Sequence, residues 1–231
     1  DLRAALRSPA MLGMGAVTAA LISVNWGIYV WAIQTGHALD AALGYYINPL
    51  FSVLLGSVLL KERLAPAQWL AIALAAAAVA VLTWETGRLP VVALGLTLTW
   101  GFYAYFKKRL PIGPNQGFML EVLILFPFAA GWVAWLTATG QGHFLQDAPT
   151  LGLLLGTGIV TAVPLMIYAN GAKLLRLSTI GILQYIAPTM IFLTAVFWFG
   201  EPFDSARMIA FLLIWAALAI YTTSLVRQAR A

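Results

Sequence analysis

The stretch ALGYYINPLFSVLLGSVLLKERL, residues 42–64, is apolar over most of its length and ends in a cluster of charges. A helix needs roughly 20 apolar residues to cross the hydrocarbon core of a bilayer, which is about 30 Å thick. The run that contains this stretch meets that requirement, and seven further runs along the chain do so as well. The eight expected spans are approximately 10–34, 38–60, 66–84, 89–106, 117–137, 150–170, 177–199 and 206–225. The sequence therefore predicts an all-α, polytopic membrane protein.

Pro66 suits a first helical turn, Asp204 suits an N-cap, and Gly87 falls just outside a span. The GxxxG spacing of Gly152 and Gly156 and the alanine run 75–78 predict close packing between helices.

Composition excludes the soluble classes of protein. Hydrophobic residues make up 62% of the 231 residues, charged residues make up 9%, and the mean hydropathy is +0.89. A soluble domain of this size needs far more charge on its surface. The chain has no cysteine, and its only histidines are His37 and His143. Without H-E-x-x-H, G-x-S-x-G or a nucleotide motif, we expect no enzyme, no metal and no cofactor.

The positive charges predict the orientation of the spans. If the eight spans alternate, all Lys and Arg residues except Arg88 and Arg207 fall on one side of the membrane, which is 11 of the 13. Lys and Arg in short loops stay in the cytoplasm. Both ends of the chain are therefore expected to be cytoplasmic, and the net charge of +5 is a topology signal that does not imply nucleic acid.

Part of the stretch 42–64 is repeated later in the chain. Tyr46, Ile47 and Pro49 return as Tyr185, Ile186 and Pro188, and Glu62 returns as Glu201, each at a spacing of 139 (185 − 46 and 201 − 62). Residues 86–231 contain five expected spans, whereas residues 1–85 contain three. The first repeat is therefore expected to have two more helices before Asp1, which gives ten helices as five plus five. An odd number of spans inverts the second repeat, as in secondary transporters that work by alternating access.

Long motifs also carry a family resemblance over essentially the whole chain. They include NWGIYVWAIQTGHALDAALGYYINPLFSVLLGSVLLKERLAPAQW (25–69), GFMLEVLILFP (117–127) and LRLSTIGILQYIAPTMIFLTAVF (175–197). These stretches resemble the RarD branch of the EamA family, in the drug/metabolite transporter (DMT) superfamily. The resemblance implies ten helices in two EamA repeats, a bacterial inner (plasma) membrane, and transport of small organic metabolites or drugs. Against that pattern, this chain lacks the first two helices.

Polar and helix-breaking positions at membrane depth are the candidate substrate site, because such positions are costly in hydrocarbon. Pro49 and Pro188 lie within expected spans, and each frees the carbonyl four residues earlier, at Tyr45 and Gln184. The candidate substrate-binding residues are Asn25, Tyr29, Tyr45, Asn48, Tyr168, Gln184 and Tyr185. They suit a polar cavity with aromatic walls. In the alternative, the prolines shape packing and the polar side chains bond helices together.

Each carboxylate in or beside the expected spans has two possible roles. Glu121 is either a proton-coupling site or a partner of the nearby positive charges that orients its helix. Asp40 either complements the positive end of its helix or binds a cation of the substrate. Glu62 and Glu201, at span ends, are expected to be interfacial and paired with neighbouring Lys or Arg, with a gate as the other reading.

The alternative function is a non-transporting integral membrane partner or scaffold subunit. An inverted repeat argues against it, since a scaffold has no need of two exchangeable halves. The expected partners of a transporter are the lipid bilayer and a small-molecule substrate, while protons and a second copy of the chain in a homodimer are left open. Substrate identity and transport direction are not readable from the sequence.

Cysteine labelling tests the predicted orientation, because the native chain has no cysteine. Single cysteines introduced near Gly36 and Gly142 should react with an impermeant thiol reagent supplied from the periplasm. Cysteines near Arg63 and Arg109 should not react. The opposite labelling pattern would overturn the orientation inferred from charge.

Overall fold

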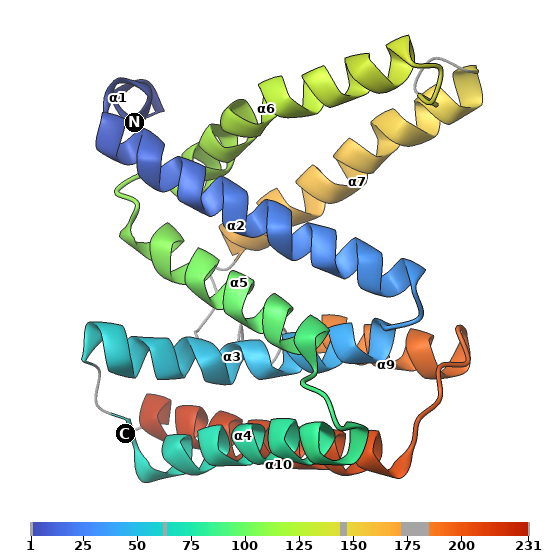
Figure 1. The fold of residues 1–231 in the computed structure, drawn as a ribbon. Coiled ribbons are helices and arrows are strands. Elements are labelled where there is room, and N and C mark those ends of the chain that lie inside the picture. Colours follow the sequence, from blue (N-terminus) through green and yellow to red (C-terminus); the bar gives the residue numbers. More distant parts are fainter. Residues whose placement is uncertain (1, 62–63, 144–146, 172–184, 231) are drawn as a thin grey trace. The chain divides into compact units, whose positions relative to one another are not determined.

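The computed structural model describes residues 2–61, 64–143, 147–171 and 185–230, and all regular structure in these ranges is helical (Figure 1). The helices are α1 (Leu2–Arg7), α2 (Pro9–Gln34), α3 (Ala38–Leu60), α4 (Pro66–Thr86), α5 (Val91–Arg109), α6 (Pro114–Ala138), α7 (Ala148–Gly171), α9 (Ile186–Phe197) and α10 (Ser205–Arg230). Each expected span overlaps one helix from α2 to α10. The prediction of an all-α polytopic protein is confirmed.

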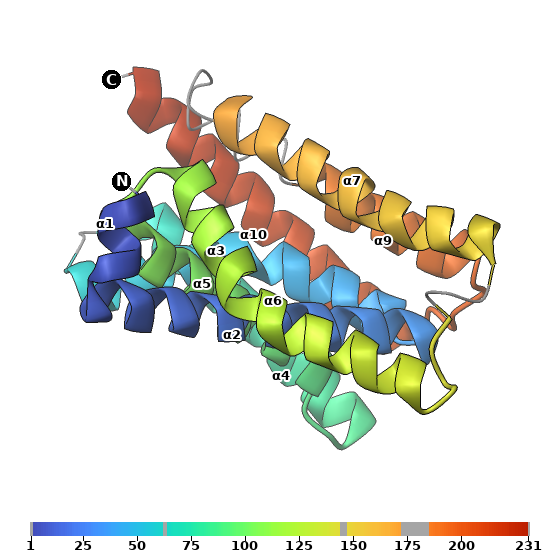
Figure 2. The same ribbon diagram turned by 90° about the horizontal axis from the view of Figure 1, so that it is seen from above.

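In the part of the chain that the structure describes, six helices are long and apolar enough to cross a membrane. They are α2, α3, α4, α6, α7 and α10. The helix α5 is 19 residues long and ends in Lys107, Lys108 and Arg109, and the described part of the span predicted at 177–199 is the shorter apolar helix α9. The helices α6 and α7 contain the internal prolines Pro127 and Pro164. Figure 2 shows each of them as one continuous helix.

Helix ends follow the boundary chemistry that the sequence predicted. Pro66 is the first residue of α4, and Gly87 ends that helix with a left-handed φ of 67°. Asp204 accepts a hydrogen bond from the N–H of Arg207 (2.8 Å) at the start of α10. Asp147 does the same for Thr150 (2.7 Å) before α7, and bonds from Thr150 hold the pKa of the Asp147 carboxyl below its ordinary value. Such caps satisfy N–H groups that a helix cannot satisfy itself.

The chain divides into two compact units, which we describe separately. Unit 1 comprises residues 1–19 and 107–175, and unit 2 comprises residues 20–106 and 176–231. Each unit therefore takes segments from both predicted repeats. The repeat boundary between residues 85 and 86 is a division of the sequence and stays a prediction.

In unit 1, α1 packs against α6. Ala5, Leu110 and Leu120 are buried there, and Gly15 of α2 lies directly against the side chain of Leu120. Gly152 and Gly156 behave differently from the close packing that their GxxxG spacing predicts, since a methyl group added at either would meet no atom within 4 Å. Within the described part of unit 1, that expectation is wrong.

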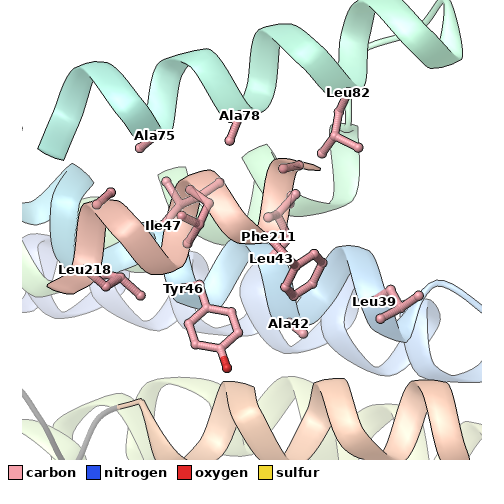
Figure 3. Packing of buried hydrophobic residues seen from close by; sticks show 14 of the residues in the cluster. Leu39, Ala42, Leu43, Tyr46, Ile47, Ala75, Ala78, Leu82, Phe211 and Leu218 are labelled. Atoms are coloured by element: carbon pink, nitrogen blue, oxygen red, sulfur yellow. The ribbon is translucent and has the colours of Figure 1, made fainter. Parts of the chain in front are cut away.

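In unit 2, the main hydrophobic core joins α3, α4, α9 and α10. The small residues Ala71, Ala75 and Ala78 share one face of α4 and let α10 approach closely, as the alanine run predicted. Figure 3 shows Ala75 and Ala78 directed toward the cluster that contains Leu43 and Phe211. Small residues at such contacts allow van der Waals packing, which holds membrane helices together where burial from water contributes little.

A second close approach in unit 2 brings α3 against α5. A Cβ atom at Gly44 would lie 2.8 Å from the backbone oxygen of Ala93, and one at Gly101 would overlap the ring of Phe51. The hydroxyl of Thr97 donates to the carbonyl of Gly44 (3.0 Å) and ties the two helices together. The glycines therefore decide how near α5 lies to the middle of α3.

Replacing Gly44 tests this contact. Gly44→Ala should destabilise the protein by about 1–3 kcal/mol, because the new methyl group meets backbone that cannot rotate away. Gly27→Ala in α2 is the matched control, since nothing lies within 4 Å of that position. The control should change stability by less than about 1 kcal/mol, in the stabilising direction. Thermal unfolding in a mild detergent measures both, and equal midpoints for the two variants would contradict the packing described here.

Candidate functional site

Asn25 links three helices of unit 2 through its side-chain amide. It is fully buried in α2. Its Nδ2 donates to the carbonyl of Leu96 (3.1 Å) and to the hydroxyl of Thr99 (2.8 Å), both in α5. The Tyr45 hydroxyl of α3 donates to its Oδ1 (3.3 Å). Asn25 thus performs the helix-bonding role that the sequence left as an alternative, and it also holds Tyr45 in place.

Aromatic rings surround this amide. Tyr29 and Tyr45 meet edge to face, with ring centroids 5.8 Å apart, and Tyr45 meets Trp100 in the same way at 6.4 Å. Edge-to-face contacts of this kind favour one relative orientation of the rings. The structure therefore brings together three predicted site residues, Asn25, Tyr29 and Tyr45, and adds Trp100, which the sequence analysis did not single out.

Asn48 lies on the side of α3 that faces α5. It follows Gly44 by one turn and precedes Phe51 by nearly one, and both of those residues contact α5. The Asn48 side chain is 5% exposed, and its Oδ1 has no hydrogen-bond partner in the part of the chain that the structure describes. Leaving a buried acceptor unpaired costs about 1–3 kcal/mol. Asn48 is therefore a polar group for which the described fold supplies no donor.

A second polar and aromatic group lies on another side of α3, toward α9. The Tyr46 and Thr189 hydroxyls are hydrogen bonded at 2.6 Å, and the Tyr46 ring stacks on Tyr185 with centroids 6.5 Å apart. The Tyr185 hydroxyl is buried near Thr222 without a hydrogen bond of standard geometry. Tyr46 was recognised only as a marker of the repeat. Its hydroxyl points away from the apolar cluster in Figure 3.

The other predicted site residues are less fully described. Tyr168 lies in α7, in unit 1, and nothing is described of its side chain; Gln184 lies outside the described residues. Pro49 is inside α3, which continues to Leu60. Pro188 is the third residue of α9, in the first turn, where the missing N–H breaks no bond within that helix.

Glu201 corrects one expectation. It was expected to be interfacial and paired with Lys or Arg, but it is 7% exposed and forms no ion pair with any described Lys or Arg. Its carboxylate accepts hydrogen bonds from the N–H groups of Ala38 (2.6 Å) and Leu39 (2.9 Å), at the start of α3. A negative charge is favourable there because the N-terminal end of a helix is partly positive. Glu62, its counterpart in the repeat, lies outside the described residues.

Asp40 lies in the first turn of α3, 3.9 Å from Arg207 of α10. Since Glu201 already bonds the first N–H groups of α3, Asp40 contributes its charge to the helix end without a cap bond. Among the described residues, no group of three His, Cys, Asp or Glu side chains could hold a metal ion.

Glu121 of unit 1 is paired with a lysine. It is 3% exposed, and its Oε1 lies 2.6 Å from the Nζ of Lys107. This is the contact that the orienting alternative predicted. Gain of a proton by a buried carboxylate would also weaken its pairing with a cation, so the contact is compatible with either role of Glu121.

Replacing Glu201 by glutamine tests its role at the start of α3. The amide keeps one acceptor but turns an NH₂ group toward a backbone N–H, so Glu201→Gln should destabilise the protein by about 1–3 kcal/mol. Glu85→Gln, at an exposed position in α4, is the control that removes the same charge. Thermal unfolding at neutral pH measures both variants. A Glu201→Gln protein as stable as the Glu85→Gln protein would show that the two hydrogen bonds do not hold α3.

Comparison with known proteins identifies the family of this chain. The model of the EamA-like transporter family matches residues 3–84. An uncharacterized transporter of Pseudomonas aeruginosa is 45% identical over 217 residues, which cover 93% of this chain and 72% of that protein. Protein RarD of Escherichia coli is 41% identical over 95% of this chain and 75% of its own length. The chloramphenicol-sensitive protein RarD of Pseudomonas aeruginosa is 34% identical over 92% of this chain and 71% of its own length. The chain therefore belongs to the EamA family of multi-pass bacterial membrane transporters, as a RarD-type member.

Proposed function

We propose that this chain is the greater part of a secondary transporter that moves a small amphipathic organic molecule across the bacterial inner membrane by alternating access. The repeat at a spacing of 139 supports two exchangeable halves of inverted orientation. The distribution of Lys and Arg supports cytoplasmic positions for both ends of the chain. A relative that is named an uncharacterized transporter and matches 93% of the chain supports the general activity.

The unpaired Oδ1 of Asn48 is the observation that carries the proposal. Asn48 follows the first residue of α3 by ten positions and precedes the last by twelve, so it lies near the middle of a membrane-spanning helix. An amide at that depth without a hydrogen-bond donor is unfavourable unless something else supplies one. A substrate with an N–H or O–H group supplies that donor.

The surroundings of Asn48 define the class of substrate. Tyr45 lies about one turn away on the same helix, and its ring contacts Tyr29 and Trp100. Aromatic side chains give a ligand apolar contact area together with a few fixed polar groups, which suits an uncharged or weakly charged amphipathic molecule. The name of one relative, chloramphenicol-sensitive protein RarD, makes chloramphenicol the first molecule to test, since it carries hydroxyl and amide donors on an aromatic body.

Proton coupling is the second part of the proposal, and it rests on the Lys107 and Glu121 pair. A carboxylate and an ammonium group 2.6 Å apart stabilise each other while both are charged. Gain of a proton by Glu121 would remove the attraction between this charged pair. A pair that forms and breaks with protonation can link a proton gradient to a change of conformation.

Removing the Asn48 amide separates the substrate role from a packing role. Asn48→Ala should lower chloramphenicol uptake into proteoliposomes about tenfold, the loss of one hydrogen bond of about 1.4 kcal/mol to the ligand. Its thermal stability should stay equal or rise, because an unsatisfied buried group has been removed. Asn115→Ala, at an exposed asparagine in α6, should change neither property. Normal uptake by Asn48→Ala, or a marked loss of its stability, would assign Asn48 to packing.

Neutralising Glu121 tests the coupling. In proteoliposomes with an imposed pH gradient, the wild-type protein should accumulate chloramphenicol and the Glu121→Gln protein should only equilibrate it. Exchange of chloramphenicol without a gradient should persist in the variant, which shows that it is folded and binds. Accumulation by Glu121→Gln in response to the pH gradient would exclude Glu121 as the coupling site.

A further inference from the structure

Two arginines that break the charge pattern of the sequence meet at one cavity of unit 2. Arg88 and Arg207 are the only Lys or Arg residues that the alternating spans place on the side opposite to the other eleven. They are 119 positions apart in the sequence (207 − 88), one in the α4–α5 loop and one in the first turn of α10. Both line the same cavity of about 210 Å³. Because Arg88 and Arg207 are both exceptions to the charge rule and both line one cavity, we expect the cavity to have a function that needs positive charge.

The two guanidinium groups differ in how far their charge is compensated. Arg207 donates to the carbonyl of Pro202 (2.6 Å) and lies 3.9 Å from the Asp40 carboxylate. Arg88 is exposed and forms no ion pair with any residue that the structure describes. Asp40 also lines the cavity, and its charge acts on both arginines. Glu201 accepts hydrogen bonds from the N–H groups of α3. Arg88 is therefore the guanidinium group of this cavity that has no ion pair with a described residue.

Apart from the arginines, the cavity is lined by the polar residues His37, Asp40 and Thr86 and by apolar residues, several of which are exposed. Trp31, Leu89 and Val91 all line it, and they are 50%, 57% and 73% exposed. Trp31 also stacks on His37, another lining residue, with ring centroids 5.1 Å apart. Tryptophan beside arginine at the ends of membrane helices is typical of the boundary between headgroups and acyl chains. A ligand of this cavity would meet positive charge and apolar surface together.

We propose that this cavity binds the phosphodiester headgroup of an anionic phospholipid, with the phosphate on Arg88 and the acyl chains along Leu89 and Val91. The inference is independent of the transported substrate. A guanidinium group presents planar pairs of donors that match phosphate oxygens, and Arg88 has these donors free of ion pairs. The cavity volume accommodates a headgroup, while the chains remain in the bilayer.

The test measures thermal unfolding of the intact protein in a non-ionic detergent with added phosphatidylglycerol. The wild-type midpoint should rise by about 5 °C near saturation. Arg88→Gln should lose most of this rise, Arg88→Lys should keep part of it, and without lipid the Arg88→Gln midpoint should equal that of wild type. Arg227→Gln, which removes an exposed charge near the other end of α10, should keep the full rise.

Two further ligands identify the source of the phosphate. Diacylglycerol, which has the chains without the phosphate, should give no rise, and sn-glycerol 3-phosphate, which has the phosphate without the chains, should give little. If glycerol 3-phosphate alone raises the unfolding midpoint as much as the lipid does, the cavity binds a soluble oxyanion, and the assignment to a lipid is overturned. An undiminished rise in Arg88→Gln, or an equal rise with diacylglycerol, would overturn the site itself.

Discussion

Polar groups inside a membrane protein must find hydrogen-bond partners within the protein, because hydrocarbon offers none. The amide of Asn25 meets this requirement through α3 and α5, and the carboxylate of Glu201 meets it for the first N–H groups of α3. These bonds join residues far apart in the sequence, so they decide which helices are neighbours in unit 2. Where the described fold leaves a buried group unpaired, as at Asn48, the proposed substrate would supply the missing donor.

The helix α3 makes a different contact on each of its sides. Gly44 admits α5 at close range, Tyr46 reaches Thr189 of α9, and the first turn is held by Glu201. The proposed substrate group, Asn48, follows these contacts along the helix, two residues after Tyr46. A displacement of α3 therefore alters the surroundings of Asn48 and the contacts of both neighbouring helices together, which is what alternating access requires of a helix beside the substrate.

Prediction from the sequence was most successful where the information is local. The apolar runs, with Pro66, Gly87 and Asp204 at their ends, predicted the helices to within a few residues, because span length and capping depend on neighbouring residues. Partners distant in the sequence were harder to predict. Nothing near Glu201 indicates that it bonds Ala38, 163 residues earlier, and the nearby charges favoured an ion pair instead. Lys107 was among the partners foreseen for Glu121, since the two lie only 14 residues apart. The spacing within α3 predicted that Tyr45 and Asn48 lie near each other, but only the packing shows that Asn25 is satisfied and Asn48 is not.

Access to residue 48 from the two sides of the membrane tests the central claim most directly. Because the native chain has no cysteine, Asn48→Cys gives a single thiol at the proposed substrate position. If residue 48 lies at the substrate site, an impermeant thiol reagent should reach this thiol from the cytoplasmic side and from the periplasmic side. Chloramphenicol should slow both reactions. A thiol at residue 48 that reacts from neither side, with the protein folded, would contradict a transporter with its ligand at Asn48 and favour a solidly packed membrane scaffold.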